Sequence, residues 1–237
     1  MHMRFIAIAG AVLMTAGPAA HASTVDLSAY VNANVSSYTQ GWNYPAPGPL
    51  AIGGVGFSLA GYGGGVGVIQ TLGQGESYTV GGLDIADADV AYTIANSAFG
   101  GYGSTIATIT FTGSGGASVT YDYTEGTTIR DHYYGWYNNV ATGIYANAAF
   151  IDGAIVPDAP GLVRFDVQRF SLAPLMGQNL ASITLTDTMG SGQAFLAAVT
   201  TDSTVPEPAT WAMLVAGFGM VGLASRRRMP VRAAVRG

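Results

Sequence analysis

Two neighbouring segments of the chain alternate between apolar and polar side chains. Residues 107–112 read Ala-Thr-Ile-Thr-Phe-Thr, and residues 119–124 read Val-Thr-Tyr-Asp-Tyr-Thr. A period of two is typical of a β-strand that buries one face and leaves the other in solvent. The glycine-rich residues 113–117 between them favour a tight connection. The pattern therefore predicts an antiparallel hairpin.

The same alternation recurs further along the body, and no segment of helical period lies between the two ends. The other alternating positions are Val163, Phe165 and Val167, then Ile183 and Leu185, then Phe195, Ala197 and Val199. Many short strands with glycine-rich turns and no repeat of 20–50 residues favour a sandwich over a solenoid. We predict an all-β body, an antiparallel two-sheet sandwich with jelly-roll topology.

Charge is distributed unevenly along the chain. All fourteen acids lie between Asp26 and Glu207 with only three arginines, so this part carries a net charge of −11, against −5 for the whole chain. Such a surface repels nucleic acid and anionic lipid. The chain has no cysteine, which excludes disulfides, thiolate nucleophiles and cysteine-bound metals.

The N-terminus has the three parts of a secretory signal. Arg4 is followed by the apolar residues 5–14 and by the small-residue box Ala20-His21-Ala22. We expect residues 1–22 to form a signal helix, to engage the Sec translocon and to be removed by signal peptidase, leaving Ser23 first. A buried N-terminal helix is the alternative, and Pro18 fits it poorly.

The C-terminus combines an extended tripeptide, an apolar run and a basic cluster. Pro206, Glu207 and Pro208 precede the apolar residues 209–225, after which come Arg226, Arg227 and Arg228. The apolar run is at the short limit for a bilayer-spanning helix, and the arginines would hold its end in the cytoplasm with the body outside. A plain membrane anchor is the alternative interpretation.

These C-terminal residues resemble the PEP-CTERM sorting signal of Gram-negative bacteria. The resemblance implies that an exosortase reads Pro206, Glu207 and Pro208 and processes the protein nearby. It divides the chain into a body at 23–204, a sorting signal at 205–230 and a short basic tail at 231–237. It also implies transient residence in the inner membrane, and then the cell surface, outer membrane or extracellular matrix.

The body resembles an uncharacterised module of PEP-CTERM proteins, through residues 52–57, 91–100, 125–132, 183–187 and 195–200. This resemblance implies a galactose-binding-like jelly roll of the kind found in carbohydrate-binding modules.

The densest polar cluster is Arg130-Asp131-His132, which contains the body's one histidine. His132 could act as a general base, but no nucleophile motif accompanies it. A loop ion pair or a sugar-binding group is the preferred interpretation. Asp84, Asp87 and Asp89 could hold a structural calcium, with Asp87 and Asp89 on one face of a strand. Their spacing lacks the glycine and distal glutamate of an EF-hand loop, so ordinary surface acids are favoured.

Aromatic residues gather after His132 and in an earlier loop. The candidates for carbohydrate binding are His132, Tyr134, Trp136, Tyr137 and Trp42. Aromatic faces stack on sugar rings while neighbouring polar groups bind hydroxyls. Ordinary packing in a β core is the alternative.

Three functions remain open at this stage. The first is a non-enzymatic surface or matrix protein that associates with exopolysaccharide, the setting that the resemblance implies. The second is an ice-binding or other adhesive protein, because a similar tail occurs on some ice-binding proteins. Thr108, Thr110 and Thr112 support it, but one row is too small to match a lattice. The third, a secreted glycan hydrolase, needs two carboxylates in a cleft and has no identifying motif here. We expect no enzymatic activity.

Overall fold

The computed structural model describes residues 22–38, 44–132, 144–145, 148–151, 164–175, 177–190, 192–202 and residue 218. The chain divides into a compact unit at residues 20–205 and a second unit at residues 1–19 and 206–237, of which only Phe218 is described. Within the described residues, no helix has the length and apolar character needed to cross a membrane. Apart from Ala22 and Phe218, the predicted signal helix and the predicted span at 209–225 lie outside the described residues.

The compact unit is built from β-strands in two main sheets and one hairpin. The large sheet contains β1 (Ser23–Thr24), β2 (Ala33–Asn34), β5 (Gly61–Tyr62), β6 (Gly65–Gln70), β8 (Val90–Ala98), β11 (Ile144–Tyr145), β12 (Ala148–Ile151), β13 (Val167–Ser171) and β15 (Gln193–Asp202). The smaller sheet contains β7 (Ser77–Val80), β9 (Thr105–Gly113), β10 (Ser118–Thr124) and β14 (Leu180–Asp187). The hairpin is β3 (Gly48–Ile52) with β4 (Val55–Leu59), and two short 3₁₀ turns are η1 (Val35–Tyr38) and η2 (Ala173–Leu175).

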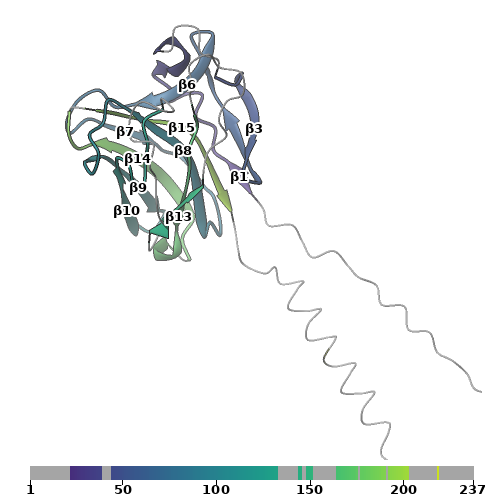
Figure 1. Ribbon diagram of the computed structural model, residues 1–237. Helices are drawn as coiled ribbons and strands as arrows, with labels where there is room; N and C mark the ends of the chain where they lie inside the picture. Colours follow the sequence, from purple (N-terminus) through teal and green to yellow (C-terminus); the bar gives the residue numbers. More distant parts are fainter. Residues whose placement is uncertain are drawn as a thin grey trace, which may run out of the picture. The chain divides into compact units, whose positions relative to one another are not determined.

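The strands pair antiparallel throughout, and from β6 onward the chain passes repeatedly between the sheets (Figure 1). The central order of the large sheet is β13-β8-β15-β6, and that of the smaller sheet is β10-β9-β14-β7. The prediction of an all-β, antiparallel sandwich is confirmed at this level.

The smaller sheet has one buried and one exposed face, as the alternation predicts. Its β9–β10 hairpin has Thr110 opposite Thr120 and Phe111 opposite Val119. Apolar side chains point from it toward the large sheet and form the main core. This core includes Ile109, Phe111, Ile183 and Leu185 from the smaller sheet, and Ala95, Phe170 and Leu196 from the large one. Period-two patterning therefore predicted the inner face correctly.

The large sheet is buried on both faces, which the sequence pattern did not predict. Almost every residue of β8 and β15 is buried. On the face opposite the main core, Ile94 and Phe195 belong to a second apolar cluster with Phe57 and Leu59 of the hairpin. Strands covered on both sides do not alternate, because neither set of side chains meets water. The hairpin thus adds a partial third layer.

The two ends of the body lie side by side on one strand pair. Ser23 pairs with Thr201, and Thr24 pairs with Thr200, at the end of β15. Strand β1 begins at the residue that we predict to be the mature N-terminus.

Candidate functional site

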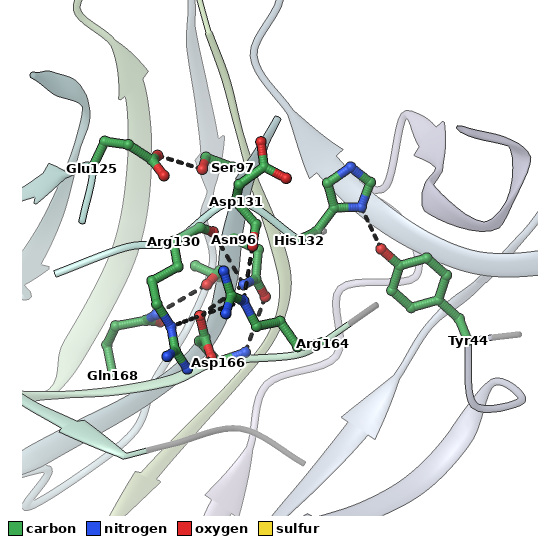
Figure 2. Close-up of polar contacts among 11 residues, drawn as sticks. Tyr44, Asn96, Ser97, Glu125, Arg130, Asp131, His132, Arg164, Asp166 and Gln168 are labelled. Carbon is green, nitrogen blue, oxygen red and sulfur yellow. Dashed lines mark hydrogen bonds and ion pairs between the residues drawn. The ribbon is translucent and has the colours of Figure 1, made fainter. Parts of the chain in front are cut away.

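A cluster of charged side chains is buried beside the end of β8 in the large sheet, where three parts of the chain meet (Figure 2). The segment after β10 brings Arg130, Asp131 and His132 alongside the end of β8. Backbone hydrogen bonds fix this contact: the Ser97 N–H donates to the Arg130 carbonyl at 2.9 Å, and the His132 N–H donates to the Ser97 carbonyl at 2.9 Å. The residues just before β13 complete the cluster.

The centre of the cluster is a two-pronged ion pair between Arg130 and Asp166. The Arg130 Nε donates to Asp166 Oδ2 at 2.9 Å, and its Nη2 donates to Oδ1 at 2.5 Å. Asn96 supports the same carboxylate, since its Nδ2 donates to Asp166 Oδ2 at 3.0 Å. Asp166 is fully buried. Such fork-shaped pairing satisfies a buried carboxylate far better than a single contact would.

A second buried arginine, Arg164, ties together the two ends of the segment 133–163. Its backbone N–H donates to the His132 carbonyl at 3.0 Å, and its Nε donates to the Asp131 carbonyl at 2.9 Å. Its Nε also lies 3.7 Å from Asp166 Oδ2. Burial lowers the pKa of Arg164, and the neighbouring Asp166 charge opposes that shift. The chain therefore leaves and re-enters the body at one fixed place.

The remaining carboxylates of the cluster bind the end of β8 and the turn after it. Glu125 accepts a hydrogen bond from the Ser97 hydroxyl. Asp131 Oδ2 accepts one from the Phe99 N–H at 3.1 Å. Phe99 has a φ of 62°, a left-handed conformation that is strained for an aromatic residue. The buried acid thus helps to hold this turn in an unfavourable conformation.

His132 lies at the edge of the cluster and faces protein rather than solvent. Its ring is 1% exposed, with Nδ1 2.6 Å from the Tyr44 hydroxyl and the Phe195 ring edge-on at 5.5 Å. Burial, with a smaller effect from the Arg164 charge, lowers the pKa of His132 to about 4. The imidazole is therefore neutral at pH 7, when Nδ1 can accept a hydrogen bond from Tyr44.

The His132 environment predicts a pH-dependent loss of stability. Because the pKa is about 6.5 in the unfolded chain and about 4 in the folded one, only the unfolded chain takes up this proton in between. We expect the free energy of unfolding to fall by about 3 kcal/mol as the pH drops from 6.5 to 4. Urea unfolding across this range would measure it. In His132→Gln this part of the slope should vanish, and equal slopes in both proteins would contradict the assignment.

Two exposed aromatic side chains lie next to the cluster, in the turn between β8 and β9. Phe99 and Tyr102 are each 66% exposed. Tyr102 lies against Gly126, where a Cβ atom would overlap its ring. Strong exposure of two large rings in one short turn is unusual for a residue type that normally packs or binds. Sequence patterning missed this pair, because isolated aromatics in a glycine-rich turn carry no periodic signal.

The predicted site residues are placed unevenly. Trp42, Tyr134, Trp136 and Tyr137 lie outside the described residues, as do Ala20, the Pro206-Glu207-Pro208 segment and Arg226 to Arg228. Ala22 and Ser23 are described and exposed. His132 lies in the buried cluster. Arg130 forms an ion pair with Asp166, and an ion pair was one of the two interpretations that the sequence favoured for this cluster.

The acids considered for calcium are arranged differently from the prediction. Asp87 lies in a turn with a φ of 53° and not in a strand, so the expected shared strand face with Asp89 is wrong. Asp84 accepts a hydrogen bond from Asn179 Nδ2 at 2.5 Å. Within the described ranges, no group of three or more His, Cys, Asp or Glu side chains is placed to hold a metal ion.

Fold and site together define an all-β, antiparallel sandwich whose charged cluster is enclosed by protein. Residues 204–228 match a family model described as the PEP-CTERM protein-sorting motif. No curated protein and no solved structure was found to match the chain. The chain thus carries the tail that marks proteins for export to the cell envelope or surface of Gram-negative bacteria, with processing by an exosortase. The predicted sorting motif is confirmed at these residues.

Proposed function

We propose that this chain is a non-enzymatic surface or matrix protein whose body binds exopolysaccharide after exosortase-dependent sorting. The observation that carries the proposal is the pair of exposed rings, Phe99 and Tyr102, beside the fixed base of segment 133–163. That segment contains Tyr134, Trp136 and Tyr137, and it starts directly after His132. In this proposal the exposed pair and the aromatic residues of segment 133–163 bind the same glycan.

The chemistry of these rings suits a polysaccharide that is neutral or carries few anionic groups. Flat aromatic faces bury the apolar faces of pyranose rings, and each ring contributes modestly, so binding needs several of them. The negative charge between Asp26 and Glu207 would repel a strongly acidic polymer. We therefore place neutral polysaccharides first among the ligands.

A jelly-roll body, galactose-binding-like in kind, is the fold that we propose for this function. Its support is the strand order. Counted from β6 with the short edge strands β11 and β12 left out, the large sheet takes the first, third, sixth and eighth strands, with the first beside the last. The smaller sheet takes the second, fourth, fifth and seventh, which is the arrangement of a double Greek key.

A binding role is also favoured over hydrolysis by the state of the buried acids. Glu125, Asp131 and Asp166 are fully buried and bind Ser97, the Phe99 N–H and Arg130. A glycosidase needs two carboxyl groups on either side of an accessible sugar bond. These three acids stabilise the protein instead, and His132 is equally enclosed.

The binding proposal predicts a specific loss when the rings are removed. Tyr102→Ala and Trp136→Ala should each weaken binding to the host's exopolysaccharide by about 2- to 10-fold, because a stacked ring contributes about 0.5–1.5 kcal/mol. Affinity electrophoresis in polysaccharide-containing gels would measure this.

Tyr62→Ala is the matched control, because Tyr62 is 45% exposed on β5, away from this turn. It should bind as the wild type does. Unchanged binding in both test variants would refute the proposal. A loss of cooperative unfolding in either variant would assign that residue to the core and equally contradict its role as a platform.

A further inference from the structure

Three turns at one end of the sandwich carry most of the exposed large apolar side chains of the compact unit. Among its described residues there are five such side chains. Four of them lie in these turns: Leu72 between β6 and β7, Phe99 and Tyr102 between β8 and β9, and Met189 between β14 and β15. Each is between 38% and 66% exposed. We call these four residues the apolar rim.

The three turns are packed against one another. A Cβ atom added at Gly192 would lie 3.2 Å from the Cα atom of Gly100, in the turn between β8 and β9. A Cβ atom added at Gly190 would lie 3.3 Å from the backbone nitrogen of Gln74, in the turn between β6 and β7. The turn that carries Met189 therefore touches both of the others, and the rim residues come from adjoining turns.

A carboxylate holds the backbone at three of the four rim positions. Glu76 Oε2 accepts a hydrogen bond from the Leu72 N–H at 2.7 Å. Asp187, which is buried, accepts one at Oδ1 from the Met189 N–H at 2.9 Å. At the third position, in the turn between β8 and β9, the carboxylate is that of Asp131. Hydrogen bonds to an ionised acceptor are strong, so these turns are ordered before a ligand binds and lose less conformational entropy on binding.

The three turns offer no counter-charge to an acidic ligand. Residues 71–76, 99–104 and 188–192 contain no lysine, arginine or histidine, and their one acid is Glu76. A sugar with carboxylate, sulfate or phosphate groups needs a cationic partner of this kind. The net negative charge of the body would repel such a sugar in addition. The rim therefore suits an uncharged ligand.

The aliphatic members of the rim select a different feature from the aromatic ones. An aromatic ring stacks on the flat C–H face of a pyranose. Leu72 and Met189 have no flat face, and they gain free energy by burying methyl or methylene groups. Ordinary hexoses present hydroxyl groups around the ring. Sugars with a 6-deoxy position or an O-acetyl ester present methyl groups instead.

We propose that the apolar rim binds a neutral polysaccharide that carries methyl groups, with Leu72 and Met189 in contact with those groups. This inference rests on the proposed sugar-binding function and names the class of sugar. The methyl groups come from 6-deoxyhexoses or from O-acetyl esters, which share this chemistry. Phe99 and Tyr102 keep their role as stacking platforms.

A second copy of the chain and a lipid bilayer suit the rim less well. A stable interface between proteins buries about 800 Å² on each partner, which is more than four partly exposed side chains supply. Protein segments that lie in a membrane interface are rich in basic residues, which attract anionic lipids. The three turns contain none.

The test compares polymers with and without methyl groups. The processed protein, recovered from the surface of cells with an exosortase, is run in gels that contain dextran, O-acetylated dextran or a neutral rhamnan. The wild type should bind a methyl-bearing polymer about 4-fold more tightly than dextran if one methyl group is buried, and about 15-fold more tightly if two are. A preference for acetylated dextran alone identifies O-acetyl esters, and a preference for the rhamnan alone identifies 6-deoxyhexoses.

Substitutions in the rim should remove this preference selectively. Leu72→Ser and Met189→Ser should each lose most of it and keep the wild-type affinity for dextran. Leu72→Met retains an apolar side chain and should keep the preference. Tyr62→Ser, on β5 and outside the rim, is the matched control and should also keep it. All three positions are exposed, so thermal unfolding should show folded variants.

The outcomes separate this inference from the proposed function. Equal binding of the wild type to the three polymers would overturn the inference, as would a preference that folded Leu72→Ser and Met189→Ser retain. If Tyr102→Ala still weakens binding to the host's exopolysaccharide, the proposed function stands without it. If the wild type binds none of these polysaccharides, both fail. Binding to phosphatidylcholine vesicles, or dimerisation, that Leu72→Ser abolishes without any methyl preference would assign the rim to a bilayer or a second copy and overturn the inference as well.

Discussion

Replacing Glu207 by alanine should leave export intact and stop processing of the tail. The matched motif spans residues 204–228 and includes this glutamate between two prolines. Proline favours an extended backbone, the conformation that a protease-like active site can bind, and the glutamate is the one charged group of the tripeptide. We expect a precursor that begins at Ser23 and keeps its C-terminal tail in the inner membrane fraction, in place of the processed form. Intact-mass analysis of the fractions would measure both species.

A strain without the exosortase provides the comparison for this result. Wild-type protein in that strain should have the mass and location of Glu207→Ala in the complete strain. Ser203→Ala, just before the matched residues, is a control that should be processed normally. A plain membrane anchor makes the opposite prediction, since one change outside the apolar run would alter nothing. Identical masses for the wild type and Glu207→Ala in both strains would therefore exclude the sorting role.

Removing the charge of Asp166 should be the most destabilising single change in the body. Asp166→Asn keeps the size of the side chain but leaves Arg130 and Arg164 buried without their shared counter-charge. Breaking a buried pair in this way costs about 3–5 kcal/mol. For a domain of this size the midpoint of thermal unfolding should fall by roughly 6–20 °C. Calorimetry would measure the change.

The surface acid Asp122 is the matched control for this substitution. It lies exposed on β10, so Asp122→Asn should change stability by no more than about 0.5 kcal/mol. A loss for Asp166→Asn as small as that of the control would show that the ion pair contributes nothing to stability. Segment 133–163 should also become more sensitive to proteolysis, because Arg164 joins its two ends.

The position of the charged cluster explains why sequence patterning did not find it. Arg164 and Asp166 alternate with the apolar Phe165 and Val167, so a period of two assigns them to a solvent face. That assignment assumes a sheet with one solvent-exposed face. In the structure Phe165 and Val167 pack in the second apolar cluster with the hairpin residues Phe57 and Leu59. The alternate residues Arg164 and Asp166 are buried as well, in the charged cluster. Their partners, Arg130 and Asn96, are far away in sequence and are brought close only by strand pairing.

The outer face of the smaller sheet shows the same limit in another way. Alternation at 107–112 correctly predicted that threonines lie outward on β9, and it did the same for Thr184 and Thr186 on β14. It could not predict that these strands are neighbours in matching register. The arrangement of these side chains across the sheet depends on pairing between strands that lie about 70 residues apart.

What the sequence determined by itself is local: the sorting motif near the C-terminus, the β character of the body, the β9–β10 hairpin and the inner face of the smaller sheet. Each depends on residues close together in the chain, where composition and periodicity act directly. The tertiary structure alone decided which strands are neighbours, that the large sheet is covered on both faces, and that Arg130, Arg164 and Asp166 meet inside it. These features arise from contacts between distant segments, and their free energy depends on burial and register, which no single segment encodes.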